Sequence, residues 1–236
     1  IGVGFFTDNK GHFVTNYHVL ESYLNHPKDF SIQFQTNDGE EFSDVEIEKC
    51  SNDNKIDLCY GKIETPKKIY FFDVLNRSPV HSQIVSFIGH SNEEYFASKN
   101  GEVSSLDTNV EEKFGVPFND RENRNTSMVE IGKYVCNNGH CKGDSGGPVF
   151  DPFTGDLLGV FCNGIGKKNQ EKKLYAIDSK EVYAFINSDS KFTKLKIPKE
   201  HFHFKPQKIT SVEQKEITPG RGEEFEFERR TGKLEK

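Results

Sequence analysis

The sequence of 236 residues lacks tryptophan and contains one methionine and five cysteines. With 21 phenylalanines in place of tryptophan, we expect a core rich in phenylalanine. No run reaches the roughly 18 apolar residues that a membrane-spanning helix needs, so we expect no membrane span. Basic residues (31) are outnumbered by acidic ones (37), which argues against a nucleic-acid-binding protein. The five cysteines form an odd set whose spacing matches no zinc module.

The charge pattern changes after residue 188. Residues 189–236 carry 12 basic and 9 acidic side chains, few aliphatic ones and no sustained periodicity. Such a segment buries too little apolar surface to offset the entropy that ordering would cost. We therefore predict a compact domain over residues 1–188, followed by a charged, flexible C-terminal extension (residues 189–236) that a partner could contact.

Short strand patterns separated by turn signals fill the predicted domain. Apolar or alternating runs predict strands at residues 4–7, 12–15, 30–35, 45–48, 58–63, 83–88, 129–135, 148–150, 157–161 and 174–177. The polar run 8–11 ends in glycine and predicts a hairpin turn between the first two strands. Many short strands at regular spacing favour barrels or a sandwich over a parallel sheet.

Helical periodicity is almost absent outside residues 179–187. Asp178 or Ser179 could cap a helix there. Its apolar stripe would consist of Val182, Phe185 and Ile186. The sequence thus predicts an all-β chain with one C-terminal helix, and a long polar surface loop at residues 105–127.

The strongest chemical signal is the run Gly143-Asp144-Ser145-Gly146-Gly147-Pro148. Glycines beside a serine permit a tight turn and let a substrate backbone approach the hydroxyl. Serine alone is a poor nucleophile, so it needs a base and an orienting acid. His18 follows one predicted strand and Asp57 opens another, and Asp53 is the main rival to Asp57.

Four motifs together resemble the trypsin-like (chymotrypsin-fold) serine peptidases. They are Gly-x-Gly-Phe at 2–5, Thr-x-x-His at 15–18, Asp-Leu at 57–58 and the hexapeptide at 143–148. The resemblance covers residues 2–187 and is closer to the disulfide-poor HtrA-type and viral branches than to digestive trypsins. It implies two antiparallel β-barrels of chymotrypsin type, about residues 1–90 and 91–188, with the active site between them. Ile1 lies so close to His18 that we expect the first barrel to lack its first strand.

The resemblance also assigns chemistry to individual residues. His18 would take the proton of Ser145 as this serine attacks the scissile carbonyl, and Asp57 would fix the tautomer of His18. The backbone N–H groups of Gly143 and Ser145 would form the oxyanion hole. The implied partners are protein or peptide substrates, and neither a cofactor nor a metal ion is implied.

Substrate-binding residues follow from the same resemblance. The run Phe161, Cys162, Asn163 and Gly164 matches the strand that pairs with the substrate backbone. Gly139 and His140 would line one wall of the P1 pocket, and Lys173 its far wall or base. Trypsins place an aspartate where this chain has Gly139, whereas a lysine near a histidine would attract a carboxylate. We therefore expect cleavage after Glu or Asp, unless Lys173 belongs only to a solvated, lysine-rich hairpin.

Asp144 departs from the family pattern. In the family, the ammonium of a liberated N-terminus pairs with the aspartate that precedes the catalytic serine. Ile1 is too near His18 in the sequence to play this role, so we expect Asp144 to lack that partner.

The cysteines also depart from the family pattern, because no cysteine follows His18 to form the disulfide common beside that histidine. If all five cysteines are free thiols, they favour a reducing, intracellular compartment over a secreted one; they are Cys50, Cys59, Cys136, Cys141 and Cys162. Cys136 is also near enough in the sequence to bridge to Cys141. Glycosylation sequons at Asn76 and Asn125 argue in the other direction.

Two other functions remain open beside an active serine endopeptidase. The chain could be a catalytically silent trypsin-fold module that only binds, with its charged extension as the contact. It could also be a viral polyprotein-processing protease whose extension spans a processing site. Every position of the triad is filled, which favours the active enzyme.

Overall fold

The structure is a computed structural model that describes residues 1–36, 39, 41–42, 45–51, 56–64, 69–90, 97–106, 128–134, 143–165, 172–188 and 195–196. The first strands and helix are β1 (Gly4–Phe6), β2 (His12–Thr15), α1 (Tyr17–Asn25), β3 (Phe34–Gln35), β4 (Glu41–Phe42), β5 (Val45–Cys50) and β6 (Cys59–Ile63). They are followed by β7 (Ile84–Gly89), β8 (Ala97–Ser105), β9 (Met128–Tyr134), β10 (Pro148–Phe150), β11 (Leu157–Ile165), β12 (Lys172–Asp178), α3 (Ser179–Asn187) and β13 (Leu195–Lys196).

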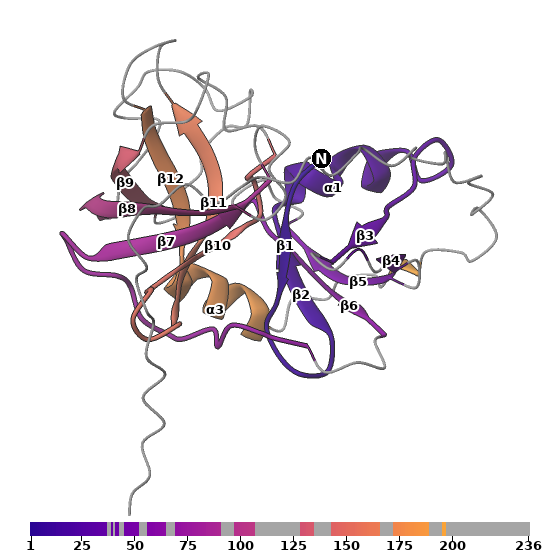
Figure 1. Cartoon of the computed structure of the whole chain (residues 1–236). Helices are drawn as coiled ribbons and strands as arrows, with labels where there is room; N and C mark the ends of the chain where they lie inside the picture. Colours follow the sequence, from indigo (N-terminus) through magenta and orange to yellow (C-terminus); the bar gives the residue numbers. More distant parts are fainter. Residues whose placement is uncertain are drawn as a thin grey trace, which may run out of the picture. The chain divides into compact units, whose positions relative to one another are not determined.

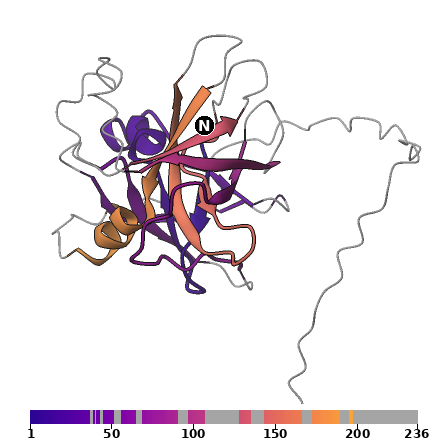
Figure 2. The same ribbon diagram turned by 90° about the vertical axis from the view of Figure 1, so that its left-hand side faces the viewer.

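The strands form two main antiparallel groups. The first is a five-stranded sheet in the order β1-β2-β6-β5-β13, and the second is a closed barrel in the order β10-β11-β12-β9-β8-β7. Figure 1 draws the closed barrel at the left and the first sheet at the right, with α3 beneath them. Figure 2 turns the closed barrel toward the viewer. The predicted mostly-β class is therefore confirmed, with the second barrel closed and the first group a sheet within the described residues.

Three apolar clusters hold these elements together. One fills the closed barrel, and a second lies between the first sheet and α1. The third joins both groups of strands to α3, because it brings together Val14 of β2, Tyr175 of β12 and Val182 of α3. The core is rich in phenylalanine as expected, its buried members including Phe5, Phe13, Phe87, Phe161 and Phe185.

The predicted hairpin and C-terminal helix are both present. β1 and β2 pair antiparallel around the turn at residues 8–11, with Phe5 opposite Val14. The helix α3 spans the predicted residues, and the side chain of Asp178 caps it by accepting a hydrogen bond from the N–H of Lys180. The choice left open between Asp178 and Ser179 is thereby resolved in favour of Asp178.

Several elements differ from the sequence predictions. The helix α1 was not predicted, because its nine residues bury only Leu20 and Tyr23 and so give a weak periodicity. The polar strand β8 was not predicted either, and only residues 34–35 of the predicted strand 30–35 form a strand. β7 belongs to the closed barrel, so the boundary between the two groups of strands lies before Ile84 and not near residue 90.

Two of the five cysteines form a disulfide. Cys50 of β5 and Cys59 of β6 face each other across neighbouring strands and are bonded. The expectation of free thiols is therefore wrong for this pair, because a register that places two cysteines opposite each other cannot be read from their spacing. Cys162 is buried and is not part of a disulfide, and Cys136 and Cys141 lie outside the described residues.

Other predictions concern parts of the chain that the structure describes little or not at all. Most of the predicted loop 105–127 lies outside the described residues. Of the predicted extension, the described strand β13 pairs with β5, Leu195 lying opposite Ile47. Within the described residues, neither helix is long and apolar enough to span a membrane.

Candidate active site

His18 lies in the first turn of α1, three residues beyond the end of β2. Asn16 is the N-cap of this helix and has extended backbone angles (φ −75°, ψ 148°). Its side chain makes no capping bond and instead donates from Nδ2 to the backbone carbonyl of Asp57 at 2.9 Å. The start of α1 is thereby tied to the segment that carries Asp57.

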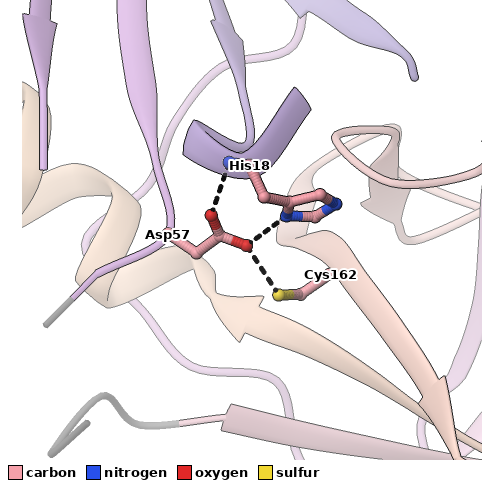
Figure 3. Close-up of side chains that lie close together, drawn as sticks. All are labelled: His18, Asp57 and Cys162. Carbon is pink, nitrogen blue, oxygen red and sulfur yellow. Dashed lines mark hydrogen bonds and ion pairs between the residues drawn. The ribbon is translucent and has the colours of Figure 1, made fainter. Parts of the chain in front are cut away.

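Asp57 binds His18 twice (Figure 3). Its Oδ1 accepts a hydrogen bond from the backbone N–H of His18 at 2.9 Å, and its Oδ2 lies 2.6 Å from the ring Nδ1 of His18. A carboxylate only accepts hydrogen bonds, so Nδ1 carries the proton and Nε2 is left as the basic nitrogen. The Asp57 side chain is buried, whereas 32% of the His18 side chain is exposed and open to a reactant.

Cys162 makes a third contact to this carboxylate, which the sequence reading missed. Its thiol donates to Oδ2 of Asp57 at 3.2 Å, as Figure 3 shows. The pairing of β11 with β12 is irregular between Phe161 and Asn163, so Cys162 sits at a bulge. A bulge re-aims a side chain, and here it turns Cys162 toward Asp57 while Phe161 stays in the barrel core.

Ser145 lies in the glycine-rich turn that precedes β10. Its hydroxyl donates to the backbone carbonyl of Cys162 at 3.2 Å, so Cys162 contacts both Ser145 and Asp57. The backbone carbonyl of Ser145 accepts a hydrogen bond from the N–H of Val3 at 2.8 Å. Gly146 has φ +88°, and a Cβ there would lie 2.1 Å from the carbonyl oxygen of Val3, so only glycine fits this position.

The same turn leaves two backbone donors available. Within the described part of the chain, no hydrogen bond engages the N–H of Gly143 or of Ser145. Gly143 has φ +97°, a left-handed conformation that glycine adopts without strain. These two N–H groups flank the nucleophile candidate and can bind a developing negative charge.

His18, Asp57 and Cys162 could also serve as metal ligands. Their side-chain donor atoms all lie within 4.8 Å of one another. The hydrogen bonds from Nδ1 and from the thiol to Oδ2 already account for this convergence. The arrangement therefore fits an oriented histidine without any metal ion.

The other predicted substrate-binding residues divide into three groups. The backbone N–H and carbonyl of Phe161 bond to Gly147 and Gly146, and its ring is buried, so Phe161 supports the serine turn and is not free to bind substrate. Gly164 and Asn163 continue β11 opposite Leu174 and Tyr175, and Lys173 lies opposite Ile165. The side chains of Asn163 and Lys173, and all of Gly139 and His140, lie outside the described residues. So does Asp53, the rival to Asp57 for the role of orienting acid.

Asp144 has a partner that the sequence reading did not foresee. Its carboxylate is buried and pairs with the ammonium group of Lys99 on β8 at 2.8 Å. This cation differs from the N-terminal ammonium that the family uses, which Asp144 was expected to lack, and Ile1 is fully exposed. Lys99 lies on a polar strand 45 residues earlier, and nothing in its local sequence points to this contact.

A second buried carboxylate lies on β9. Glu130 is buried, and its Oε2 lies 3.3 Å from the hydroxyl of Tyr175 on β12. Burial, followed by the charge of Glu130, raises the pKa of Tyr175 above its ordinary value, so Tyr175 stays protonated and donates to Glu130. Glu130 also accepts a hydrogen bond from the hydroxyl of Ser104 at 3.0 Å.

Comparisons with known proteins show the family and the fold of the chain. The family model described as a trypsin-like peptidase domain matches residues 2–160. No curated protein sequence matches the chain.

Several solved structures share the fold. Deg5 is 25% identical, with a TM-score of 0.54 over 77% of this chain and 79% of its own. The MamO protease domain from Magnetospirillum magneticum is 18% identical, with a TM-score of 0.55 over 78% of this chain and 87% of its own. The HtrA-type protease AlgW, solved with a tripeptide, is 17% identical, with a TM-score of 0.58 over 78% of this chain. Only 54% of that AlgW chain is covered, so this chain spans about half its length.

The predicted family and its HtrA-like fold are therefore confirmed, the family by a model that matches most of the chain and the fold by these structures. The chain belongs to the trypsin-like peptidase domain family and is a serine endopeptidase by that membership.

Proposed function

We propose that the chain cleaves peptide bonds with Ser145 as nucleophile, His18 as general base and Asp57 as the group that orients His18. The observation that carries this proposal is the double contact of the buried Asp57 carboxylate with the N–H and Nδ1 of His18. Cys162 links Ser145 to the same carboxylate, since its carbonyl accepts from Ser145 and its thiol donates to Asp57.

The chemistry follows from the protonation of the imidazole. Nδ1–H of His18 donates to Asp57, so Nε2 takes the proton as Oγ of Ser145 attacks the substrate carbonyl carbon. The imidazolium then gives this proton to the leaving amine as the C–N bond breaks, which leaves an acyl ester on Ser145. A water molecule, deprotonated in turn by Nε2, hydrolyses the ester and restores the hydroxyl of Ser145.

The charge that develops on the carbonyl oxygen needs donors. The N–H groups of Gly143 and Ser145 are the proposed oxyanion hole, since no hydrogen bond within the described part of the chain uses them. Each such donor contributes about 3–4 kcal/mol to the stabilisation of the transition state.

Substrate would bind as an added strand beside the end of β11. Cys162 sits at a bulge there, where the pairing of β11 with β12 is irregular, and its carbonyl accepts a hydrogen bond from the hydroxyl of Ser145. In strand addition, an extended peptide pairs with the backbone of such a strand. Asn163 and Gly164 would continue the contact along β11.

The direct test measures hydrolysis of a peptide library by the wild-type chain and by Ser145→Ala and His18→Ala. We expect both variants to fold. Their rate of peptide hydrolysis should be lower than that of the wild-type chain by at least about 10³-fold. A folded wild-type chain that cleaves nothing would instead identify a silent module that binds without catalysis.

We further propose that the enzyme prefers Glu or Asp at P1, on the basis of Lys173, the neighbour of Leu174 on β12. Gly139 and His140 would complete the pocket. Tyr175, on the same strand as Lys173, contacts the buried carboxylate of Glu130. That carboxylate would instead favour a positively charged P1 side chain.

Matched peptides that differ only in Glu, Lys or Phe at P1 separate these outcomes. Selectivity for Glu that Lys173→Met abolishes supports the proposal. Equal cleavage of Glu and Phe peptides, or faster cleavage after Lys, would reject it while leaving the proposed triad intact.

A further inference from the structure

Asp144 places a fully buried carboxylate directly before the proposed nucleophile. Its Oδ2 pairs with Nζ of Lys99 at 2.8 Å, and its Oδ1 is buried without a hydrogen bond. A Cβ on Gly89 would lie 2.0 Å from this Oδ1, so the end of β7 closes over the carboxylate. Water is therefore excluded, and the buried charge depends on Lys99 for compensation.

Lys99 is built into the closed barrel. It lies on β8 opposite Phe87 of β7, and only 11% of its side chain is exposed. Its ammonium group lies 5.8 Å from the centre of the Phe87 ring. Phe87 in turn lies opposite Val149 of β10, the strand that begins just after the serine turn. The position of the ammonium is thus set by the barrel and not by a flexible loop.

The serine turn needs such an external anchor. Gly143 and Gly146 both adopt left-handed angles, so the two ends of the segment 143–146 have wide backbone freedom. The carbonyl of Asp144 accepts a hydrogen bond from Gly147 at 3.1 Å, which ties the backbone of Asp144 to the turn that its side chain anchors. Holding the Asp144 side chain therefore also orients the peptide groups whose N–H donors belong to Gly143 and Ser145.

We infer that Lys99 is a positioning residue for the oxyanion hole, an ammonium group within the barrel that keeps the N–H groups of Gly143 and Ser145 directed at the substrate carbonyl. This inference rests on the proposed function. It assigns to Lys99 an effect on the transition state and not on the binding of substrate, since Lys99 is buried behind the turn.

The test compares Lys99→Met with Lys180→Met, a matched control that removes one positive charge from the exposed face of α3. For Lys99→Met we expect kcat to fall by about 10²-fold, comparable to the loss of an oxyanion donor. KM should change by less than about threefold, because only transition-state binding is lost. The inhibition constant of a peptide aldehyde, whose adduct carries an oxyanion, should weaken in parallel with kcat.

A second variant covers the case in which Lys99→Met does not fold. Lys99→Met combined with Asp144→Asn replaces the ion pair by neutral groups of similar size, which buried sites usually tolerate. We expect this double variant to fold and to keep the kcat defect. Near wild-type kcat in either folded variant, or failure of both to fold, would overturn the inference and leave the pair a purely structural element.

Failure of the inference and failure of the proposed function have different signatures. An active wild-type chain that Ser145→Ala inactivates and Lys99→Met does not would reject only the role of Lys99. A folded wild-type chain that cleaves no peptide would reject both.

Discussion

Asp57 orients His18 through two contacts, and its replacement by asparagine tests the chemical role of the carboxylate. The amide of Asp57→Asn can donate to Nδ1 and so favours the tautomer with Nε2 protonated, which cannot accept the proton of Ser145. We expect kcat to fall by about 10⁴-fold with little change in the free energy of unfolding.

Asp8 provides a matched control for that variant. It binds His12 through the same pair of contacts, to the backbone N–H at 3.1 Å and to Nδ1 at 2.6 Å, but at the turn of the first hairpin. Asp8→Asn should leave kcat within about twofold of wild type. Equal loss of activity in the two variants would mean that aspartate–histidine contacts act through stability alone.

The thiol of Cys162 donates a hydrogen bond to the carboxylate of Asp57, and two substitutions test whether this bond supports catalysis. Cys162→Ser keeps a donor for the Asp57 carboxylate and should retain kcat within about threefold. Cys162→Ala removes a hydrogen bond to a charged group, so kcat/KM should fall by about 10- to 100-fold. Steady-state kinetics of the two variants check this, and indistinguishable values would show that the thiol does not support Asp57.

At the scale of elements, α3 is fastened to the first sheet by a buried lysine. Nζ of Lys49 on β5 donates to the carbonyl of Phe185 at 2.7 Å, to the hydroxyl of Ser188 at 2.7 Å, and to the carbonyl of Ser188. A cation at the C-terminus of a helix also interacts favourably with the helix dipole. Lys49 thus links β5 to the end of α3.

Lys49→Met should therefore lower the free energy of unfolding by about 2–4 kcal/mol, because it removes three hydrogen bonds of a buried ammonium group to the end of α3. Urea denaturation measures this loss, and kcat at low temperature should stay near wild type. A change of less than about 0.5 kcal/mol, as expected for the exposed Lys180→Met, would contradict the role assigned to Lys49.

Elements with a clear local pattern were predictable from the sequence. The hairpin at residues 4–15 has turn residues between apolar strands, and α3 has both a cap and an apolar stripe. The helix α1 lacks this clarity and is held because its residues Leu20 and Tyr23 pack against the first sheet. β8 is polar and is held by its neighbours β7 and β9, which no local pattern reveals.

The candidate site was predictable where its motifs are local. The serine turn, His18 and Asp57 were named from residue type and order. The contacts of Cys162 and Lys99 were not, because one depends on a bulge in β11 and the other on the closure of the barrel. Long-range pairings of this kind are set by strand register, which the sequence does not display.

At the scale of the whole molecule, the disulfide between Cys50 and Cys59 couples stability to redox conditions. It closes a loop over nine positions of sequence between β5 and β6, so we expect its reduction to lower the free energy of unfolding by about 2–3 kcal/mol. Urea midpoints with and without reductant measure this effect. The variant Cys50→Ser with Cys59→Ser should be insensitive to reductant, and a wild-type midpoint that does not move after verified reduction would contradict the prediction.

The account depends on His18 and Asp57 making the Ser145 hydroxyl a nucleophile. A fluorophosphonate reports this directly, because it reacts with an activated serine and the adduct is located by peptide mass spectrometry. We predict one adduct, on Ser145, in the wild-type chain, and a labelling rate reduced by at least about 10³-fold in folded His18→Ala. A folded wild-type chain without the adduct, or equal labelling of the His18→Ala variant, would contradict the account.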